Sequence, residues 1–261
     1  MISDLPASAL SSQSGVVYTG GMNTVIPEIS LYGLLLAFLP TAVVIGIMMR
    51  WRLHASTAVY ATCRMLVQLL LIGYVLIYIF ETDRWIVVVS VLAVMLAVSS
   101  WIAIRPLSRR DRLGYWHALV AIAVGGLVTL LLVTQLVVDV EPWFSPRYVV
   151  PLAGMIFAGS MNAVSLAAER FQAEMARDMA PVEARRIALQ AALIPIINSL
   201  FAVGVVALPG MMTGQILSGV SPLVAAKYQI VVMSMLFGVS GISAALYLML
   251  EHRSHSGSGD A

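Results

Sequence analysis

The stretch WIVVVSVLAVMLA, Trp85 to Ala97, decides the fold class of this chain. It is apolar almost throughout and shows no alternation of polar and apolar side chains. A strand of a membrane β-barrel would alternate, because one of its faces meets lipid and the other meets the lumen. An apolar run that continues for about 20 residues is instead long enough to cross the hydrocarbon core as an α-helix. The stretch therefore predicts a transmembrane helix.

Runs of the same kind recur along most of the chain. The length criterion that identifies the first run predicts an all-α, polytopic transmembrane bundle of about seven spans. We expect a flexible extracytoplasmic tail over 1–28, one transmembrane domain over 29–250 and a flexible cytoplasmic tail over 251–261. The predicted spans are 29–49, 60–80, 85–104, 118–138, 148–168, 188–208 and 228–250.

The composition agrees with a membrane protein. Of the 261 residues 60% are hydrophobic and only 11% are charged, and the mean hydropathy is +0.93. Soluble domains carry about 25% charged residues, so lipid is the expected surrounding of most side chains. The net charge of +2 does not suggest a nucleic acid as a partner. The single cysteine, Cys63, excludes an internal disulfide and a cluster of thiolate ligands.

Arginines alternate between the loops. Loops at the cytoplasmic face of a bacterial membrane carry an excess of lysine and arginine. Placing the N-terminus outside and the C-terminus in the cytoplasm puts nearly all arginines of the loops inside. The outer loops then hold only Arg84, Arg147 and Lys227. The inner loops and the C-terminal tail hold Arg50, Arg52, Arg105, Arg109, Arg110, Arg112, Arg170, Arg177, Arg185, Arg186 and Arg253.

Arg64 and Gln68 stand one helical turn apart in the second predicted span. No Asp or Glu falls inside a predicted span, so Arg64 has no carboxylate partner in the bilayer. In one interpretation 54–62 forms an interfacial elbow, and Arg64 extends its charge to the membrane surface. In the other, Arg64 and Gln68 line a polar path for a solute, because an arginine at membrane depth is held there by function.

The fifth predicted span places Gly154, Ala158 and Asn162 on one stripe, four residues apart. Small residues on one stripe let two helices approach closely, and the Asn162 amide can bond across such a contact. We expect helix packing along this stripe and keep contact with a solute at Asn162 as the alternative.

The longest predicted inner loop, near 169–187, mixes charges with apolar residues. Phe171, Met175 and Met179 recur every four residues, which is typical of an amphipathic helix lying on the membrane surface. We expect this helix to dock a soluble partner. Its charged residues are Glu169, Arg170, Glu174, Arg177, Asp178, Glu183, Arg185 and Arg186.

The segment LPGMMTGQILSGVSP, Leu208 to Pro222, is apolar but rich in glycine and proline. It is not a regular span, and irregular backbone at membrane depth must be buried or line a cavity. Broken segments of this kind mark substrate paths in transporters. Methionine thioethers suit Cu(I) but more often fill gaps. We predict a substrate path along Arg64, Gln68, Asn162, Asn198, Pro209, Gly210, Met211, Met212, Thr213, Gly214 and Gln215.

Five stretches resemble the FetB family of transport permeases, which includes bacterial iron exporters and plant aluminium-tolerance permeases. The similarity covers most of 29–250, and LPGMMTGQILSG is its most specific part. The stretches are CRMLVQLLLIGYVLIYIF (Cys63–Phe80), PLAGMIFAGSM (Pro151–Met161), ALIPIINSL (Ala192–Leu200), LPGMMTGQILSG (Leu208–Gly219) and KYQIVVMSML (Lys227–Leu236).

The resemblance implies a permease domain over 29–250 that exports iron or another metal ion. It implies a partner ATPase of the FetA type, which binds ATP and Mg²⁺ and docks on Glu169–Arg186. One chain resembles half of a transporter, so we expect a homodimer. This chain has no G-x-x-x-x-G-K-[ST] phosphate loop, so we expect neither an enzyme nor a cofactor in it. No metal ligands are assigned, and an ion-coupled carrier or channel for a small solute is the alternative.

Overall fold

The computed structural model describes residues 16–17, 26–27, 29–82, 84–107 and 112–256. The chain forms two compact units, which we describe separately. The first contains the described residues up to Val75 together with Leu217–Val220, and the second contains Leu76–Ile216 and the residues from Ser221 onward. The all-α prediction is confirmed for these residues, apart from a two-residue ladder in which β1 (Val16–Val17) pairs antiparallel with β2 (Ile26–Pro27).

The predicted N-terminal tail, 1–28, lies outside the described residues except for this ladder. The predicted C-terminal tail begins at residue 251, which the structure places within a helix. The last helix, α9 (Pro222–Ser256), continues six residues beyond the predicted end of its span at 250. Residues 257–261 lie outside the described part of the chain.

The first unit holds the first span and most of the second. The first span is split into α1 (Leu31–Leu36) and α2 (Leu39–Arg50), and Pro40 lies in the first turn of α2. Proline lacks the N–H that would extend the earlier helix, so the split falls just before it. The second span is α3 (Ala55–Phe80). No separate elbow over 54–62 precedes the span, because the helix already begins at Ala55, and the depth of Arg64 in the membrane stays untested.

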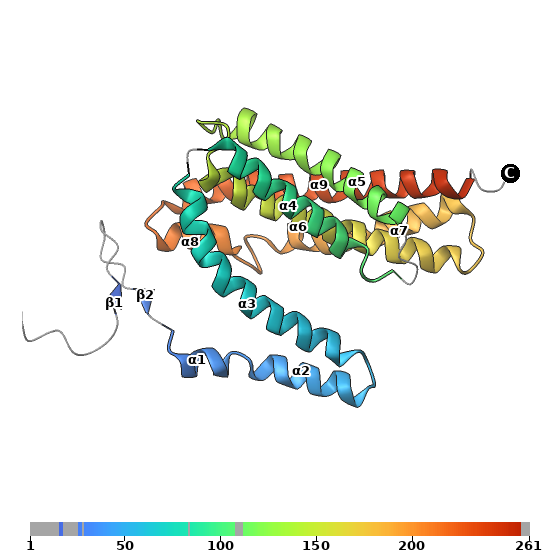
Figure 1. Cartoon of the computed structure of the whole chain (residues 1–261), viewed down its shortest axis with the longest axis horizontal. Helices are drawn as coiled ribbons and strands as arrows, with labels where there is room; N and C mark the ends of the chain where they lie inside the picture. Colours follow the sequence, from blue (N-terminus) through green and yellow to red (C-terminus); the bar gives the residue numbers. More distant parts are fainter. Residues whose placement is uncertain (1–15, 18–25, 28, 83, 108–111, 257–261) are drawn as a thin grey trace, which may run out of the picture. The chain divides into compact units, whose positions relative to one another are not determined.

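The second unit is a bundle of long helices (Figure 1). Its helices α4, α6 and α9 run in one direction, and α5 and α7 run in the opposite direction. The helix α6 is central, because it packs against α4, α5, α7 and α9. The bundle consists of the end of α3, α4 (Trp85–Ala103), α5 (Arg112–Leu131) with its π-helical continuation η1 (Leu132–Val137), α6 (Pro146–Met175), α7 (Pro181–Ala202), α8 (Gly210–Leu217) and α9.

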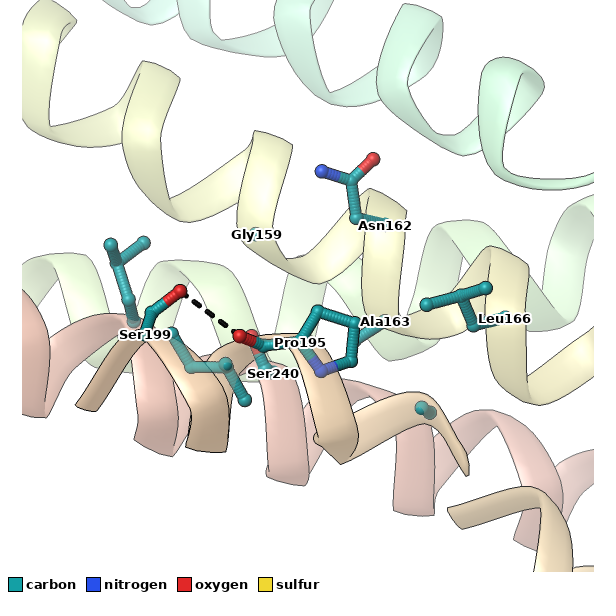
Figure 2. A pocket seen from close by; sticks show the side chains of 10 residues that line it. Gly159, Asn162, Ala163, Leu166, Pro195, Ser199 and Ser240 are labelled. Carbon is teal, nitrogen blue, oxygen red and sulfur yellow. Dashed lines mark hydrogen bonds between the residues drawn. The ribbon is translucent and has the colours of Figure 1, made fainter. Parts of the chain in front are cut away.

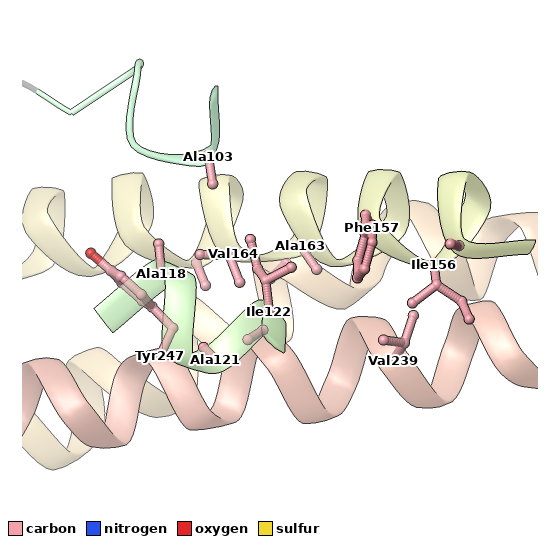
Figure 3. Close-up of a cluster of buried hydrophobic side chains, with 14 of the residues drawn as sticks. Ala103, Ala118, Ala121, Ile122, Ile156, Phe157, Ala163, Val164, Val239 and Tyr247 are labelled. Carbon is pink, nitrogen blue, oxygen red and sulfur yellow. The ribbon is translucent and has the colours of Figure 1, made fainter. Parts of the chain in front are cut away.

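Alanines pack together with larger apolar side chains such as Phe157 and Tyr247 at the helix contacts of this bundle (Figure 3). The buried residues of α7 are Ala184, Ala188 and Ala192, which repeat every four residues along one face. Ser243 of α9 donates a buried hydrogen bond of 3.1 Å to the Ser160 hydroxyl of α6. Lipid offers no hydrophobic drive between helices, so close approach of small side chains and interhelical hydrogen bonds hold them together.

Six helical segments are long and apolar enough to cross a membrane among the described residues. They correspond to six of the seven predicted spans. The remaining prediction, 188–208, corresponds to α7, whose 22 residues include Arg185, Arg186 and Asn198 and are less apolar. The helix α7 also ends at Ala202, because Val203 is extended and Gly204 takes a φ of +83°, which only glycine adopts readily.

Charged residues separate between the two ends of the second unit. The end of α4, the start of α5, the α6–α7 connection and the C-terminal end of α9 lie at one end (Figure 1). The opposite end carries the starts of α4, α6 and α9, with Arg84, Arg147 and Lys227. This separation agrees with the predicted topology, and the cytoplasmic assignment of the arginine-rich end remains a prediction. Arg109 and Arg110 lie outside the described residues.

Candidate functional site

The predicted surface helix over 169–187 is wrong, because the segment is a helical hairpin. Helix α6 continues to Met175, and α7 begins at Pro181, so only a short turn separates them. The stripe of Phe171, Met175 and Met179 faces the bundle: Phe171 is 2% exposed, and both methionines pack against the core. The apolar repeat that suggests a surface helix therefore belongs to two packed helix ends. We call residues 170–186 the α6–α7 hairpin.

A buried carboxylate organises the α6 side of this hairpin. Glu174 is only 2% exposed, and its Oε1 lies 2.6 Å from Arg170 Nη2 and 3.5 Å from Arg177 Nη1. A buried charge is tolerated only when it is paired. Asp178 follows with a φ of +58° and ends the turn region of α6. Arg170 and Arg177 are therefore both paired with Glu174.

The α7 side carries a second ion pair and one cation without such a pair. Arg186 Nη2 donates to Glu183 Oε1 at 2.6 Å, and its Nε also donates to that carboxylate. These hydrogen bonds lower the pKa of Glu183, which lies at the exposed start of α7 before the predicted span. Within the described residues Arg185 forms no ion pair, and its Nε is buried without a hydrogen-bond partner. Glu169, the remaining predicted docking residue, is exposed.

The stripe of Gly154, Ala158 and Asn162 does not form the predicted helix contact. Ala158 and Asn162 are exposed, and the buried face of α6 instead contains Ile156, Phe157 and Ser160. Gly154 is half-buried near Met95. The bulkier residues on the adjacent face of α6 occupy the contacts with the other helices, so the stripe that contains Asn162 lies beside these contacts and not within them. Asn162 lies beside a cavity, which is the alternative that the sequence left open.

This cavity of about 190 Å³ lies where α6, α7 and α9 meet (Figure 2). Its polar groups come from Asn162 of α6, Ser199 of α7 and Ser240 of α9. Ser199 donates a hydrogen bond of 2.9 Å to the carbonyl of Pro195, also in the lining. Sequence reasoning proposed the neighbouring Asn198, which is exposed and does not line this cavity. No local signal pointed to Ser199, because a bond to the carbonyl four residues earlier is one that any helical serine can form.

The broken segment contains a short helix, α8, and not an open glycine-rich backbone. Hydrogen bonds within this helix engage only part of its backbone, because the first N–H groups and the last carbonyls of a helix have no partner inside it. The part that this segment plays in a solute path stays a prediction. Thr213 reinforces the start of the helix, because its hydroxyl donates to the Pro209 carbonyl at 3.1 Å. Met211 packs against the core, and Gln215 Oε1 is buried without a hydrogen-bond partner among the described residues.

A larger cavity of about 360 Å³ links α8 to the rest of the second unit. Met212 is the predicted path residue that lines it. Gln229 and Met233 of α9 were missed by sequence reasoning. Gln229 is 5% exposed, and its Oε1 has no hydrogen-bond partner in the described part of the chain. The remaining lining is Leu200, Val203, Gly204, Ala226, Ile230 and Ser234.

Arg64 and Gln68 belong to the first unit. Both lie in α3 with helical spacing, where Arg64 is half-buried and Gln68 is exposed. Arg64 has no ion pair with any described carboxylate. The part that these two residues play in a solute path stays a prediction.

No preformed metal site is found among the described residues, where no three His, Cys, Asp or Glu side chains come together. Pairs of titratable side chains do occur among the described residues. One such pair, His117 and Glu251, connects α5 and α9 at the arginine-rich end, with Nδ1 2.8 Å from Oε2. His117 stands just before the predicted span 118–138, and the structure places it within α5, which already begins at Arg112.

These features define a multi-pass α-helical membrane protein whose bundle contains cavities with neutral hydrogen-bonding groups. The comparison with known proteins identifies the family. The chain belongs to UPF0014, whose family model, described as "Uncharacterised protein family (UPF0014)", matches residues 31–187 and 176–255.

Relatives cover most of this chain and of their own length. "UPF0014 membrane protein slr1647" of Synechocystis sp. is 34% identical over 75% of this chain and 82% of its own. "Probable iron export permease protein FetB" of Escherichia coli is 32% identical over 73% of this chain and 78% of its own. "UPF0014 membrane protein STAR2" of Oryza sativa is 35% identical over 72% and 70%. No solved structure matches the chain.

The resemblance read from the sequence is thus confirmed at the level of the family. Together with the six apolar helices, the relatives show a multi-pass protein of the bacterial inner membrane, in a family of membrane permeases.

Proposed function

We propose that this chain is the membrane subunit of an ATP-driven exporter whose ATPase is a separate protein. The relative named "Probable iron export permease protein FetB" supports export by a permease, and supports iron or another metal ion as the cargo. ATP and Mg²⁺ would bind the partner, because this sequence contains no phosphate loop. Two copies of the chain would form the complete transmembrane part.

The α6–α7 hairpin is the observation that carries the proposal of a soluble partner. It stands at the arginine-rich end of the second unit, and ion pairs within it hold Glu174 and Glu183. Arg170, Arg177 and Arg186 each form an ion pair, whereas Arg185 forms none among the described residues, which makes Arg185 our candidate for binding an acidic group of a partner. A rigid, charged helical hairpin is well suited to transmit a movement of an ATPase to α6 and α7.

Copurification with a FetA-type ATPase tests this proposal. Arg185→Glu should reduce the copurified ATPase by about tenfold or more, because a like charge in an interface costs several kcal/mol. Arg147→Glu reverses an exposed charge at the opposite end of α6 and is the matched control. Glu183→Gln removes the ion pair with Arg186 without reversing a charge and controls for loss of the hairpin structure. Undiminished copurification with Arg185→Glu would exclude the hairpin as the docking site.

The cargo is tested on the reconstituted pair. Ferrous ion should stimulate its ATPase activity if iron is transported, and other metal ions can be compared under the same conditions. If none of the metal ions tested changes the ATPase activity, metal export is excluded as the function.

An ion-coupled carrier is the second candidate function. It is favoured by one observation, the half-buried His117–Glu251 pair, because carriers of this kind use titratable groups that face the protein interior. Transport by the chain alone, driven by a proton gradient and abolished by Glu251→Gln, would support the carrier over the ATP-driven exporter.

A further inference from the structure

The cavities beside Ser240 and Gln229 follow one another along the same pair of helices, α7 and α9. Gln229 and Met233 line the larger cavity, and Leu236 and Ser240 line the smaller one. Their spacing of four, three and four residues places them on one face of α9. At a rise of 1.5 Å per residue, Gln229 and Ser240 are separated by about 16 Å along the helix, roughly half of the hydrocarbon thickness.

The opposite wall is formed by α7 in the same order. Ala192, Pro195 and Ser199 face the smaller cavity, whereas Leu200 and the turn at Val203 and Gly204 face the larger one. We call the surface between residues 192–204 and residues 229–240 the α7–α9 seam. It begins beside Met212 of the broken segment and reaches inward to Asn162 of α6.

Each cavity is lined by a buried polar side chain. Ser240, in the smaller cavity, is 4% exposed. Gln229, in the larger cavity, is 5% exposed, and its Oε1 has no hydrogen-bond partner among the described residues. A buried polar atom left unpaired costs about 1–3 kcal/mol. Water or a solute removes that cost, and both cavities exceed the space of about 30 Å³ that one water occupies.

The lining of the seam carries no charge. Its polar groups are the amides of Asn162 and Gln229 and the hydroxyls of Ser199, Ser234 and Ser240, and none of the lining residues is Asp, Glu, His, Lys or Arg. A bare divalent cation would lose its hydration here without a counter-charge, which is very costly. Amides and hydroxyls instead match a solute that offers hydrogen-bond donors and acceptors.

We propose that the α7–α9 seam is a water-filled solute path, in which Gln229, Ser199 and Ser240 bond to a small polar solute without net charge. This inference rests on the proposed function, because it assigns a path to a transporter. An exported metal ion would enter the seam as a neutral complex and not as the bare ion.

Accessibility of single cysteines tests the path. Ser240→Cys is prepared in a Cys63→Ala background, which contains no other thiol. Phe237→Cys, three residues earlier on α9, is the matched control, because Phe237 is 41% exposed but outside the seam lining. Ser199→Cys provides a second position on the opposite wall, and size-exclusion chromatography shows whether each variant folds.

Two thiosulfonate reagents of similar size separate the outcomes. The neutral hydroxyethyl methanethiosulfonate should modify Cys at position 240 about tenfold faster than at 237, because thiols ionise and react only where water reaches them. The cationic trimethylammonium reagent, corrected for its rate with a free thiol, should be about tenfold slower at 240 than the neutral one.

Every result of this comparison is decisive. Equal rates at 240 and 237 would show that the seam holds no water path. Equal rates of both reagents at 240 would show a path that does not select neutral solutes, and would overturn that part of the inference. The assay needs neither the ATPase nor transport, so failure of the unmodified chain to copurify with the ATPase would contradict the proposed function without affecting this result.

Discussion

His117 Nδ1 lies 2.8 Å from Glu251 Oε2, which ties the second turn of α5 to the far end of α9. The two helices are antiparallel, since Gly125, further along α5, lies against Ser243, earlier in α9. The side chains of His117 and Glu251 are only 13% and 16% exposed. The pair is therefore a partly desolvated polar contact at an otherwise apolar interface.

We expect this pair to contribute measurably to stability. A hydrogen bond to a charged group stabilises by about 1.5–3 kcal/mol, so a double-mutant cycle of His117→Ala and Glu251→Gln should give a coupling energy of about that size. Thermal unfolding in detergent measures it. Glu169→Gln, at an exposed carboxylate without a described ion pair, should have no effect. Strictly additive effects of the two substitutions would show that the groups do not interact.

Arg170 should matter more than Arg177 for the hairpin. Arg170 lies 2.6 Å from the buried Glu174, whereas Arg177 lies at 3.5 Å and is more exposed. Arg170→Ala should destabilise the protein by about 1–2 kcal/mol, because solvent screens only part of the pair. Arg177→Ala should cost about 0.5 kcal/mol or less. A lower melting temperature for Arg177→Ala than for Arg170→Ala would reverse this assignment.

Gly126 should not tolerate a side chain. A Cβ there would lie 2.9 Å from Phe157 Cε1, within the tight contact of α5 and α6. Gly126→Ala should therefore cost about 1–3 kcal/mol through overpacking. Gly238→Ala is the matched control, because nothing lies within 4 Å of that Cβ and alanine favours a helix by about 1 kcal/mol. Equal melting temperatures of the two variants would contradict the close approach of Gly126 to Phe157.

The predicted topology can be tested at two exposed positions of the second unit. In a Cys63→Ala background, Glu141→Cys should react with an impermeant thiol reagent in intact cells, because its loop carries few arginines. Ala176→Cys, in the turn between α6 and α7, should react only after the membrane is opened. The opposite labelling pattern would place the arginine-rich end outside.

The sequence by itself determined the fold class and the positions of most helices. Uniform apolar runs such as Trp85–Ala97 leave no alternative to a membrane helix, because every backbone group in lipid must be bonded within its own segment. The separation of arginines between the loops was equally visible. The separation of arginines depends only on where they stand in the sequence. In the second unit the arginine-rich connections lie at a common end.

Only the tertiary structure decided which face of each helix is buried. The repeat of Phe171, Met175 and Met179 suits a membrane surface and a packed hairpin equally well, since both bury one stripe. Ser199 and Ser240 are ordinary residues in the sequence. They become a candidate site because α7 and α9 pack against each other and leave a cavity between their polar groups, and no local pattern records the contact between two distant helices.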